Sequence, residues 1–252
     1  MSPQAEVRGF PDRLNESLII QSSMLVMMGA ELEFYSKRDI DCLSSLIRTN
    51  KWPLVSSVVK ERGVSQYEII TSPTSNLRDL SFQIQDFKDS TQDINDFSAK
   101  PFLDQPGSAM HIHLSLHQRK FPHERLALDP RMKFFIIGGL CKCIRNSMKF
   151  FAPGASSYKR FQYHDKFTPR FASWGFEDNK SNAIRVTKDT IEHRVAGADA
   201  NIGDVIEQIA RAISFGIDNK VMPGLPNFGE LKYSDSFKIR IPLSHHESVN
   251  LC

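Results

Sequence analysis

Apolar and polar positions along this chain alternate in several short stretches, and each stretch predicts a strand. Apolar runs over 18–28, followed by alternation over 31–35, predict two strands that are close in sequence. The same alternation at 66–70 and 110–116 predicts two more. Side chains two apart on each strand should therefore share one face.

Three other segments repeat their apolar residues about every 3.6 positions and predict helices. They cover 39–48, which has an acidic first turn, 129–151, and about 201–215. The second begins with Asp129 as a capping residue followed by proline, and the Ala-Pro-Gly at 152–154 ends it.

Strands and helices follow one another without the steady alternation of a doubly wound fold, so the pattern predicts an α+β fold with a mostly antiparallel sheet. With 252 residues and 40% hydrophobic side chains, the chain is long enough for a real core, and one domain over 1–252 is the default. The part 223–252 is expected to be an irregular tail, rich in Pro, Gly and Ser, with a pattern only at 237–241.

Composition narrows the partners. The net charge is +3, from 32 basic and 29 acidic residues, and no basic stripe is interleaved with aromatics, so nucleic acid is not an expected partner. Apolar runs such as 134–140 are far shorter than the roughly 20 residues that span a bilayer. No basic segment leads into an apolar one at the N-terminus. We therefore expect a cytoplasmic protein without a membrane partner.

The cysteines show no metal-binding spacing. Cys42, Cys141, Cys143 and Cys252 form no CxxC pair, and two of them lie within an apolar run. We expect reduced thiols that serve as packing residues.

Two pairs of chemically active side chains lie on predicted strands. Glu31 and Glu33 should project together, and so should His111 and His113. Each pair alone is more typical of a solvated strand face, because charged side chains are usually exposed. Their surroundings favour a site: the acids follow an apolar run at 25–28, and the histidines follow the small-residue turn at 107–110. Carboxylates with an imidazole suit Mg²⁺ or Mn²⁺, and a dinuclear site that offsets triphosphate charge needs several acids.

At this point the sequence resembles the catalytic domain of the glutamine synthetase family over about 25–222, nearest to the branch that joins glutamate to amines such as polyamines. The motifs that carry the resemblance stand in the family's order: Gly29–Phe34 (GAELEF), Glu61–Ile69 (ERGVSQYEI), Gly107–Leu116 (GSAMHIHLSL), Ser157–Phe161 (SYKRF) and Ile191–Asn201 (IEHRVAGADAN). The resemblance implies a mostly antiparallel, curved sheet with flanking helices.

The resemblance also implies two divalent metal sites, for Mg²⁺ or Mn²⁺. It assigns one metal to Glu31, Glu61 and Glu68, and the second to Glu33, His111 and Glu192.

For the substrates, the resemblance implies that ATP, a glutamate-like acid and an amine bind here. It places His113, Ser115, Lys180 and Arg185 at the nucleotide, and Gly107, Arg160 and Arg194 at the amino-acid substrate. Taken singly, each arginine is more typical of a surface salt bridge than of a substrate site. The implied reaction is attack of a carboxylate on the γ-phosphate of ATP, which gives an acyl phosphate that an amine captures.

The sequence departs from the family in several places. Only about 28 residues precede the Gly29 motif, where relatives carry a small β-grasp domain, and the interval from Glu33 to Glu61 is short. Lys166 and Phe167 fall where ammonia-using members have an acidic flap residue, Lys180 replaces an arginine, and Ile202 and its neighbours replace Pro-Tyr-Leu. We expect a homo-oligomer, or a partner chain that supplies the missing domain.

Two functions remain open from the sequence. The first is an active ligase that joins a glutamate-like acid to an amine with ATP. The second is a degenerate relative that keeps metal and nucleotide binding and acts as a regulatory or structural partner. Retention of every matched metal ligand favours the first, since a buried carboxylate without a metal carries a desolvation penalty.

Overall fold

The computed structural model describes residues 24–49, 51–118, 130–163, 166–176, 179–229 and 239–250. Its centre is one eight-stranded sheet with the order β2-β3-β1-β5-β8-β7-β6, and β4 pairs with β1 beside this path. The strands are β1 (Met24–Ser36), β2 (Val55–Lys60), β3 (Gln66–Thr71), β4 (Asn95–Asp96), β5 (Met110–Gln118), β6 (Trp174–Phe176), β7 (Ile184–Val186) and β8 (Ile191–His193). All pairs are antiparallel except β6 with β7. The predicted fold class is confirmed.

The long first strand organises the sheet. β1 pairs with β5 over Met24–Leu32 and with β3 over Glu31–Tyr35. The prediction of two separate strands at 18–28 and 31–35 is therefore wrong for the described part, while 18–23 lie outside the described residues. Gly29 and Ala30 continue the strand because they pack against Thr71, whose hydroxyl accepts a hydrogen bond from the Ala30 N–H at 2.7 Å.

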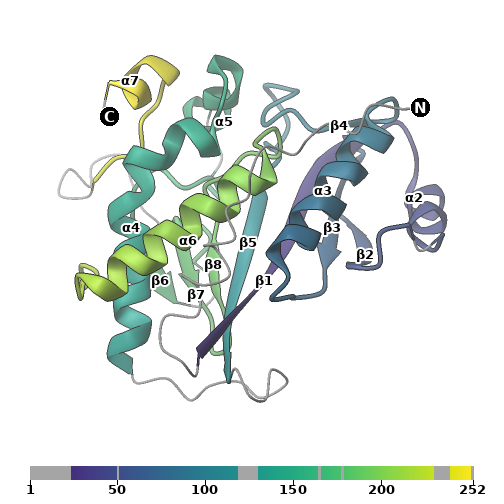
Figure 1. Cartoon of the computed structure of the whole chain (residues 1–252). Helices are drawn as coiled ribbons and strands as arrows, with labels where there is room; N and C mark the ends of the chain where they lie inside the picture. The colour runs from purple at the N-terminus through teal and green to yellow at the C-terminus, as the bar shows by residue number, and fades with distance from the viewer. Residues whose placement is uncertain are drawn as a thin grey trace.

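The helices are α2 (Ile40–Ile47), α3 (Leu77–Thr91), α4 (Pro130–Phe151), α5 (Lys159–Gln162), α6 (Ile202–Asp218) and α7 (His245–Val249), with a 3₁₀ turn at Ala155–Tyr158. The three longest, α3, α4 and α6, lie on one face of the sheet (Figure 1). The three predicted helices are confirmed as α2, α4 and α6, each within a few residues of the expected bounds. Asp39 and Asn201 cap α2 and α6 by accepting backbone N–H bonds.

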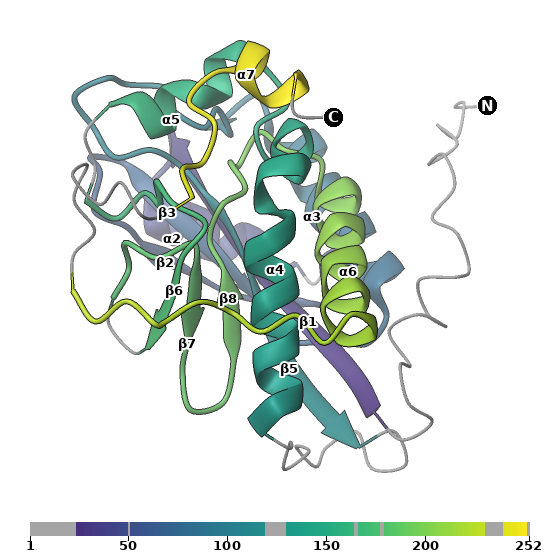
Figure 2. The same cartoon turned by 90° about the vertical axis from the view of Figure 1, so that its left-hand side faces the viewer.

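The core lies between the sheet and the pair α4 and α6, which run side by side in both views (Figure 2). On α6 the residues Ile202, Ile206, Ile209 and Ile213 are at most 1% exposed, which is the stripe that the 3.6-residue period predicts. The helices meet at glycines: a Cβ on Gly139 would lie 2.1 Å from the Ala212 carbonyl oxygen. The glycines therefore allow the backbones of α4 and α6 to approach each other closely.

The tail is only partly irregular. Residues 223–229 run along β6, where the Asn227 N–H donates to the Trp174 carbonyl at 2.8 Å. The expectation of an irregular tail misses α7, which Ser244 caps by accepting from the Glu247 N–H, while Glu247 accepts from the Leu243 N–H. The predicted pattern at 237–241 falls partly outside the described residues.

Two smaller expectations can also be compared with the structure. Cys42 is exposed on α2, so the interpretation of every cysteine as a packing residue is wrong there; Cys141 and Cys143 are partly buried, and Cys252 lies outside the described residues. Within the described part of the chain, no helix has the length and apolar character needed to cross a membrane.

Candidate active site

Strand register brings the predicted acids and histidines together. In the β1–β5 pair Glu31 lies opposite His111, and in the β1–β3 pair Glu33 lies opposite Glu68. In the β5–β8 pair His113 lies opposite Glu192. Neighbouring strands lie about 4.8 Å apart, so these side chains project from adjacent strands onto one spot of the sheet.

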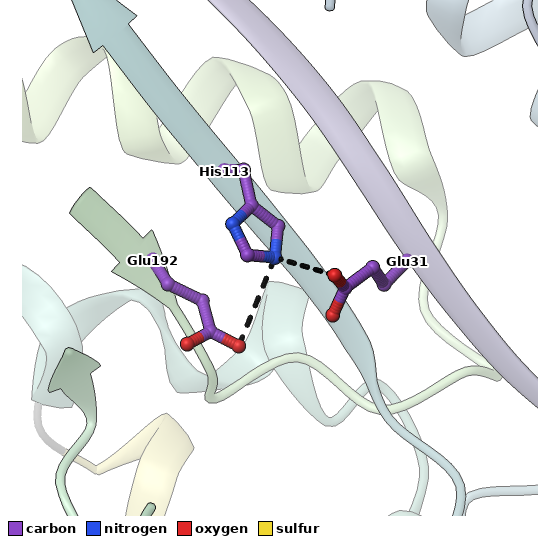
Figure 3. Close-up of side chains that lie close together, drawn as sticks. All are labelled: Glu31, His113 and Glu192. Carbon is purple, nitrogen blue, oxygen red and sulfur yellow. Dashed lines mark ion pairs between the residues drawn. The ribbon is translucent and has the colours of Figure 1, made fainter. Parts of the chain in front are cut away.

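Two histidines lie close to the same two carboxylates, and Figure 3 shows one of them, His113, with Glu31 and Glu192. His113 Nε2 lies 3.0 Å from Glu31 Oε1 and 3.8 Å from Glu192 Oε1. His111 Nδ1 lies 3.5 Å from Glu31 Oε2 and 3.6 Å from Glu192 Oε1. Nδ1 of the buried His111 has no hydrogen-bond partner among the described residues. Apart from the 3.0 Å contact of His113 with Glu31, these distances are too long for good hydrogen bonds, and such spacing suits ligands that share a cation.

The carboxylate oxygens and imidazole nitrogens that could bind a metal form three overlapping groups. In each group these atoms all lie within 4.8 Å of one another. The groups are Glu33 with Glu61 and Glu68, Glu31 with Glu68 and His111, and Glu31 with His113 and Glu192. Glu68 belongs to two of them, so it stands between the other acids.

This grouping differs from the division of ligands that the resemblance implies, and that division stays a prediction. Glu33, not Glu31, groups with Glu61 and Glu68, and Glu31 groups with His111. The reason is the antiparallel register: Glu33 lies directly opposite Glu68, two residues beyond the point where Glu31 faces His111. The two glutamates share a face, as predicted, but serve different halves of the site.

Burial and repulsion disfavour charge on two of the acids. Burial is the larger cause that raises the pKa of Glu68 to about 9, and the neighbouring carboxylates Glu31, Glu33 and Glu61 add to it. Burial raises the pKa of Glu33 to about 7, although its carboxylate accepts a 2.7 Å hydrogen bond from the Ala109 N–H. At neutral pH Glu68 therefore carries a proton and Glu33 is about half protonated, unless a cation offsets their charge.

Glu31 and Glu192, in contrast, have lowered pKa values and remain negatively charged. Burial would raise the pKa of Glu31, but His111 and His113 lower it well below its usual range. Burial likewise opposes ionisation of Glu192, and the pKa is lowered by His111, Arg194, His113 and Arg185. Burial, with Arg194 nearby, lowers the pKa of His111 to about 4, so its imidazole is neutral and able to bind a metal.

Arginines surround Glu192. Arg194 Nη1 lies 2.5 Å from Glu192 Oε1, and Arg185 Nε bonds the other oxygen. The buried Arg194 Nε has no hydrogen-bond partner among the described residues. Arg160 is used differently: Nη1 donates to the Val195 carbonyl at 2.8 Å and Nη2 to the Arg194 carbonyl at 3.1 Å, so it fixes the strand end that bears Arg194.

The acids and arginines line a cavity of about 230 Å³. Its lining residues include Glu31, Glu33, Glu61, Glu68, Gly107, His111, Arg160, Lys180, Arg185, Glu192 and Arg194. Gly107 must be glycine, since a Cβ would lie 2.9 Å from the Ala99 carbonyl oxygen and from Arg160 Cγ. His113 and Ser115 are not part of this lining; the Ser115 hydroxyl lies 2.9 Å from His117 Nε2, and the nucleotide role of both residues stays a prediction.

Sequence reasoning missed Arg62, Ala109 and Thr168, which also line the cavity. Arg62 and Ala109 lie within motifs quoted above, next to Glu61 and before Met110, and that adjacency is the signal that points to them. Thr168 follows Phe167 and has no such signal.

Phe167 stands at this cavity within reach of three cations. The Arg62 guanidinium lies 4.1 Å from its ring centroid, Lys166 Nζ 5.0 Å and Lys180 Nζ 5.9 Å. Cations over an aromatic face are attracted to it. The ring and its cations form one edge of the cavity.

The donor set fits two divalent cations of the Mg²⁺ or Mn²⁺ kind. It is made of carboxylates with one or two imidazoles, and none of the groups contains a cysteine. Glu33 and Glu68, whose pKa values are raised, are the acids that gain most from a cation.

Comparison with known proteins agrees with this geometry. The family described as the glutamine synthetase catalytic domain matches residues 43–250. The chain belongs to the glutamine synthetase family. The match begins after β1, so Glu31 and Glu33 join the site through the register rather than through the matched range.

The relatives of this chain include ligases that are named for different amines. It is 34% identical over 133 residues to gamma-glutamylputrescine synthetase PuuA of Escherichia coli (strain K12), covering 50% of this chain and 28% of that protein. It is 29% identical over 159 residues to glutamate–isopropylamine ligase of a Pseudomonas species, covering 59% of this chain and 34% of that one. The chain thus spans about a third of the length of the curated relatives it matches.

Among solved structures, the chain resembles the "GmaS/ADP complex-Conformation 1" with a TM-score of 0.78 at 18% identity, over 94% of this chain and 66% of the other. At that identity the likeness establishes the shared fold.

Proposed function

We propose that this chain is the catalytic part of an ATP-dependent ligase that joins a glutamate-like acid to an amine. Membership of the glutamine synthetase family supports the class, and the amine ligases among its relatives support the substrates. The observation that carries the proposal is the overlap of the candidate metal groups beside the arginines, in one cavity.

Two cations would be held on the two halves of the site. Glu33, Glu61 and Glu68 would hold one, and Glu31, His111 and Glu192 the other, with Glu68 close to both. When bound, the cations would offset the charge of the ATP phosphates and of the phosphoryl group during transfer.

The chain's own cations would orient the substrates. Arg194, through its unpaired Nε, is placed to bind the carboxylate of the acid. Arg185 and Lys180 line the same cavity and would contact phosphate oxygens. Arg160 would keep Arg194 in position through its bonds to the Val195 and Arg194 carbonyls.

In the proposed reaction the substrate carboxylate attacks the γ-phosphorus of ATP and ADP leaves. The amine then attacks the acyl phosphate, phosphate leaves and the amine nitrogen loses a proton. Positioning and fixed charge supply most of such catalysis, since no residue forms a bond to substrate.

An ATP hydrolysis screen tests the proposal. The protein is incubated with ATP, Mg²⁺ or Mn²⁺, glutamate and a panel of amines, and phosphate and product amide are measured. Release that requires both acid and amine is expected, and Arg194→Ala should abolish it. Metal-dependent ATP binding without turnover on any amine would instead support the degenerate relative as a regulatory or structural partner.

A further inference from the structure

The two oxygens of Glu192 are bonded to different arginines, and only one of these oxygens faces the histidines. Oε1 lies 3.6 Å from His111 Nδ1 and 3.8 Å from His113 Nε2, the second of which Figure 3 marks. Arg194 Nη1 lies 2.5 Å from this same oxygen, whereas Arg185 Nε bonds Oε2. The oxygen that a cation shared with the histidines would use is therefore already bonded to Arg194.

Strand register explains why the two arginines differ. Glu192 on β8 lies opposite His113 of β5 on one side and opposite Arg185 of β7 on the other, so Arg185 approaches from the side away from the histidines. Arg194 follows Glu192 by two residues, and both side chains line the catalytic cavity. Arg194 therefore contacts Glu192 on the side where the candidate metal ligands meet.

The Arg194 side chain is held by this one contact. Among the described residues, Glu192 is the only hydrogen-bond partner of its guanidinium, and its buried Nε has none. Its backbone is fixed separately, because Arg160 donates to the Arg194 and Val195 carbonyls. Loss of the bond to Glu192 would therefore let the Arg194 side chain turn within the cavity while the backbone stays in place.

A divalent cation and the Arg194 guanidinium would repel each other at Glu192. Mg²⁺ lies about 2.1 Å from its carboxylate ligands, so a cation on Oε1 would stand within roughly 5 Å of Arg194 Nη1. A carboxylate oxygen has lone pairs for both partners, but positive charges this close repel each other. Glu192 is 0% exposed, so salt and water screen this repulsion little. Charge rather than space therefore sets the cation against Arg194.

We propose that a divalent cation and Arg194 compete for Glu192 Oε1, so that cation binding releases Arg194 to bind the carboxylate of the acid substrate. The release toward the acid rests on the proposed function, whereas the competition rests on the candidate metal site alone. Because such coupling is reciprocal, the acid tightens cation binding by the same factor by which the cation tightens acid binding. The acid alone would bind weakly, since Glu192 then holds the arginine that the acid needs.

The competition is tested by calorimetric titration of the whole protein with Mn²⁺, without nucleotide or acid, at the site that Glu31→Ala removes. Arg194→Gln should bind Mn²⁺ about three- to tenfold more tightly than the unaltered protein, because the competing charge is gone. Arg185→Gln is the matched comparison, since it removes the same charge from the other oxygen, and it should gain clearly less. Arg211→Gln, at an exposed arginine paired with Glu207 on α6, should bind like the unaltered protein.

Three results overturn the competition. They are Mn²⁺ affinity in Arg194→Gln that is unchanged or weaker, an equal gain in Arg185→Gln, which would mean that only net charge matters, and no Mn²⁺ binding by any of these proteins.

The release is tested by repeating the Mn²⁺ titration in saturating glutamate. Glutamate should tighten Mn²⁺ binding several-fold in the unaltered protein and in Arg211→Gln, and should have no effect in Arg194→Gln. An affinity of the unaltered protein that glutamate does not change overturns the release. Neither titration needs turnover, so the two proposals can fail separately. Turnover without this coupling would contradict the release alone, and coupling without turnover on any amine would contradict the proposed ligase alone.

Discussion

Glu192 has a fully buried side chain, yet its pKa is lowered, because two histidines and two arginines surround it. On the opposite side, burial and neighbouring carboxylates, Glu61 among them, disfavour the charged forms of Glu33 and Glu68. The negative charge of Glu192 is therefore balanced by groups of the protein itself. The charges of Glu33 and Glu68 are not, and an external cation would balance them.

Metal-dependent nucleotide binding is the first prediction at this scale. Glu192→Ala and His111→Ala should weaken ATP binding in the presence of Mg²⁺ by more than the roughly 10–100-fold that is typical of residues one layer away from a metal. Calorimetry measures the affinity, with Glu207→Ala on the surface of α6 as the control. If both variants bound ATP as tightly as the unaltered protein does, Glu192 and His111 would not be metal ligands.

Glu68 gives a pH prediction for the protein in EDTA. Because its pKa is raised to about 9 from 4.5, the folded state binds more protons than the unfolded state between these values, so the free energy of unfolding falls as pH rises across that window. Glu68→Gln should flatten this slope and stabilise the metal-free protein at pH 8 by on the order of 1–3 kcal/mol.

Urea unfolding at several pH values measures that slope, and Mg²⁺ should stabilise the unaltered protein more than it stabilises Glu68→Gln, in which one of the two proposed cation sites is weakened. Glu207→Gln is the matched control. A variant with the unaltered slope would show that Glu68 is not the group that titrates.

Phe167 leads to a prediction about the amine. Its ring lies among Arg62, Lys166 and Lys180, where an acid of an ammonia-using relative is expected from the resemblance. An aromatic edge suits an alkyl chain, so amines larger than ammonia should be preferred. Phosphate release with putrescine or ethanolamine should exceed release with ammonium, and Phe167→Ala should reduce that preference. Equal or faster release with ammonium contradicts it.

At the scale of elements, the local sequence pattern predicts helices that have their own caps and apolar stripe. It misses elements that form only through contacts with other parts of the chain. The helices α2, α4 and α6 follow from caps and period, whereas no prediction covered α3, although Leu77, Leu80, Ile84 and Phe87 have helical spacing. The exposed Phe82 obscures that stripe. The short strands β6, β7 and β8 have three residues each, too few for periodicity to reveal.

The candidate site shows the same division. The same-face pairs at Glu31 and His111 follow from the period of a strand, and register then decides which acid meets which histidine. Register is a tertiary property that one strand's sequence does not contain, so the sequence alone does not show that Glu33, rather than Glu31, lies opposite Glu68. The capping pair Ser244 and Glu247 of α7 was readable, since Ser-x-x-Glu is a capping box.

The crossing of α4 and α6 gives a prediction for elements. Gly139→Ala would place a methyl 2.1 Å from the Ala212 carbonyl oxygen and 2.6 Å from Gly216 Cα, so the helices must separate. Urea unfolding should show a loss of about 1–3 kcal/mol or more. Gly224→Ala is the control, because its Cβ would have nothing within 4 Å and should cost little. Equal stabilities would mean that the crossing tolerates a wider separation.

At the scale of the whole molecule, helices cover one face of the sheet, and part of strand β1 has an unpaired edge. β1 pairs with β5 from Met24 onward, but β3 joins it only from Glu31, and a single bridge from Met28 to Thr74 fills the gap. The backbone of residues 24–27 therefore has a neighbouring strand on one side only, within the described structure (Figure 1). Such an edge favours association with another chain.

We therefore expect a homo-oligomer whose contact includes the stretch 18–28, of which 18–23 lie outside the described residues. Sedimentation velocity at several protein concentrations should show a coefficient that rises with concentration. Met27→Lys should lower it, because a charge on an open strand edge opposes pairing. Phe82→Lys, at a side chain 61% exposed on α3, is the control for non-specific hydrophobic association and should associate as the unaltered protein does. A strictly monomeric species that turns over ATP with an amine would show that no neighbour is required.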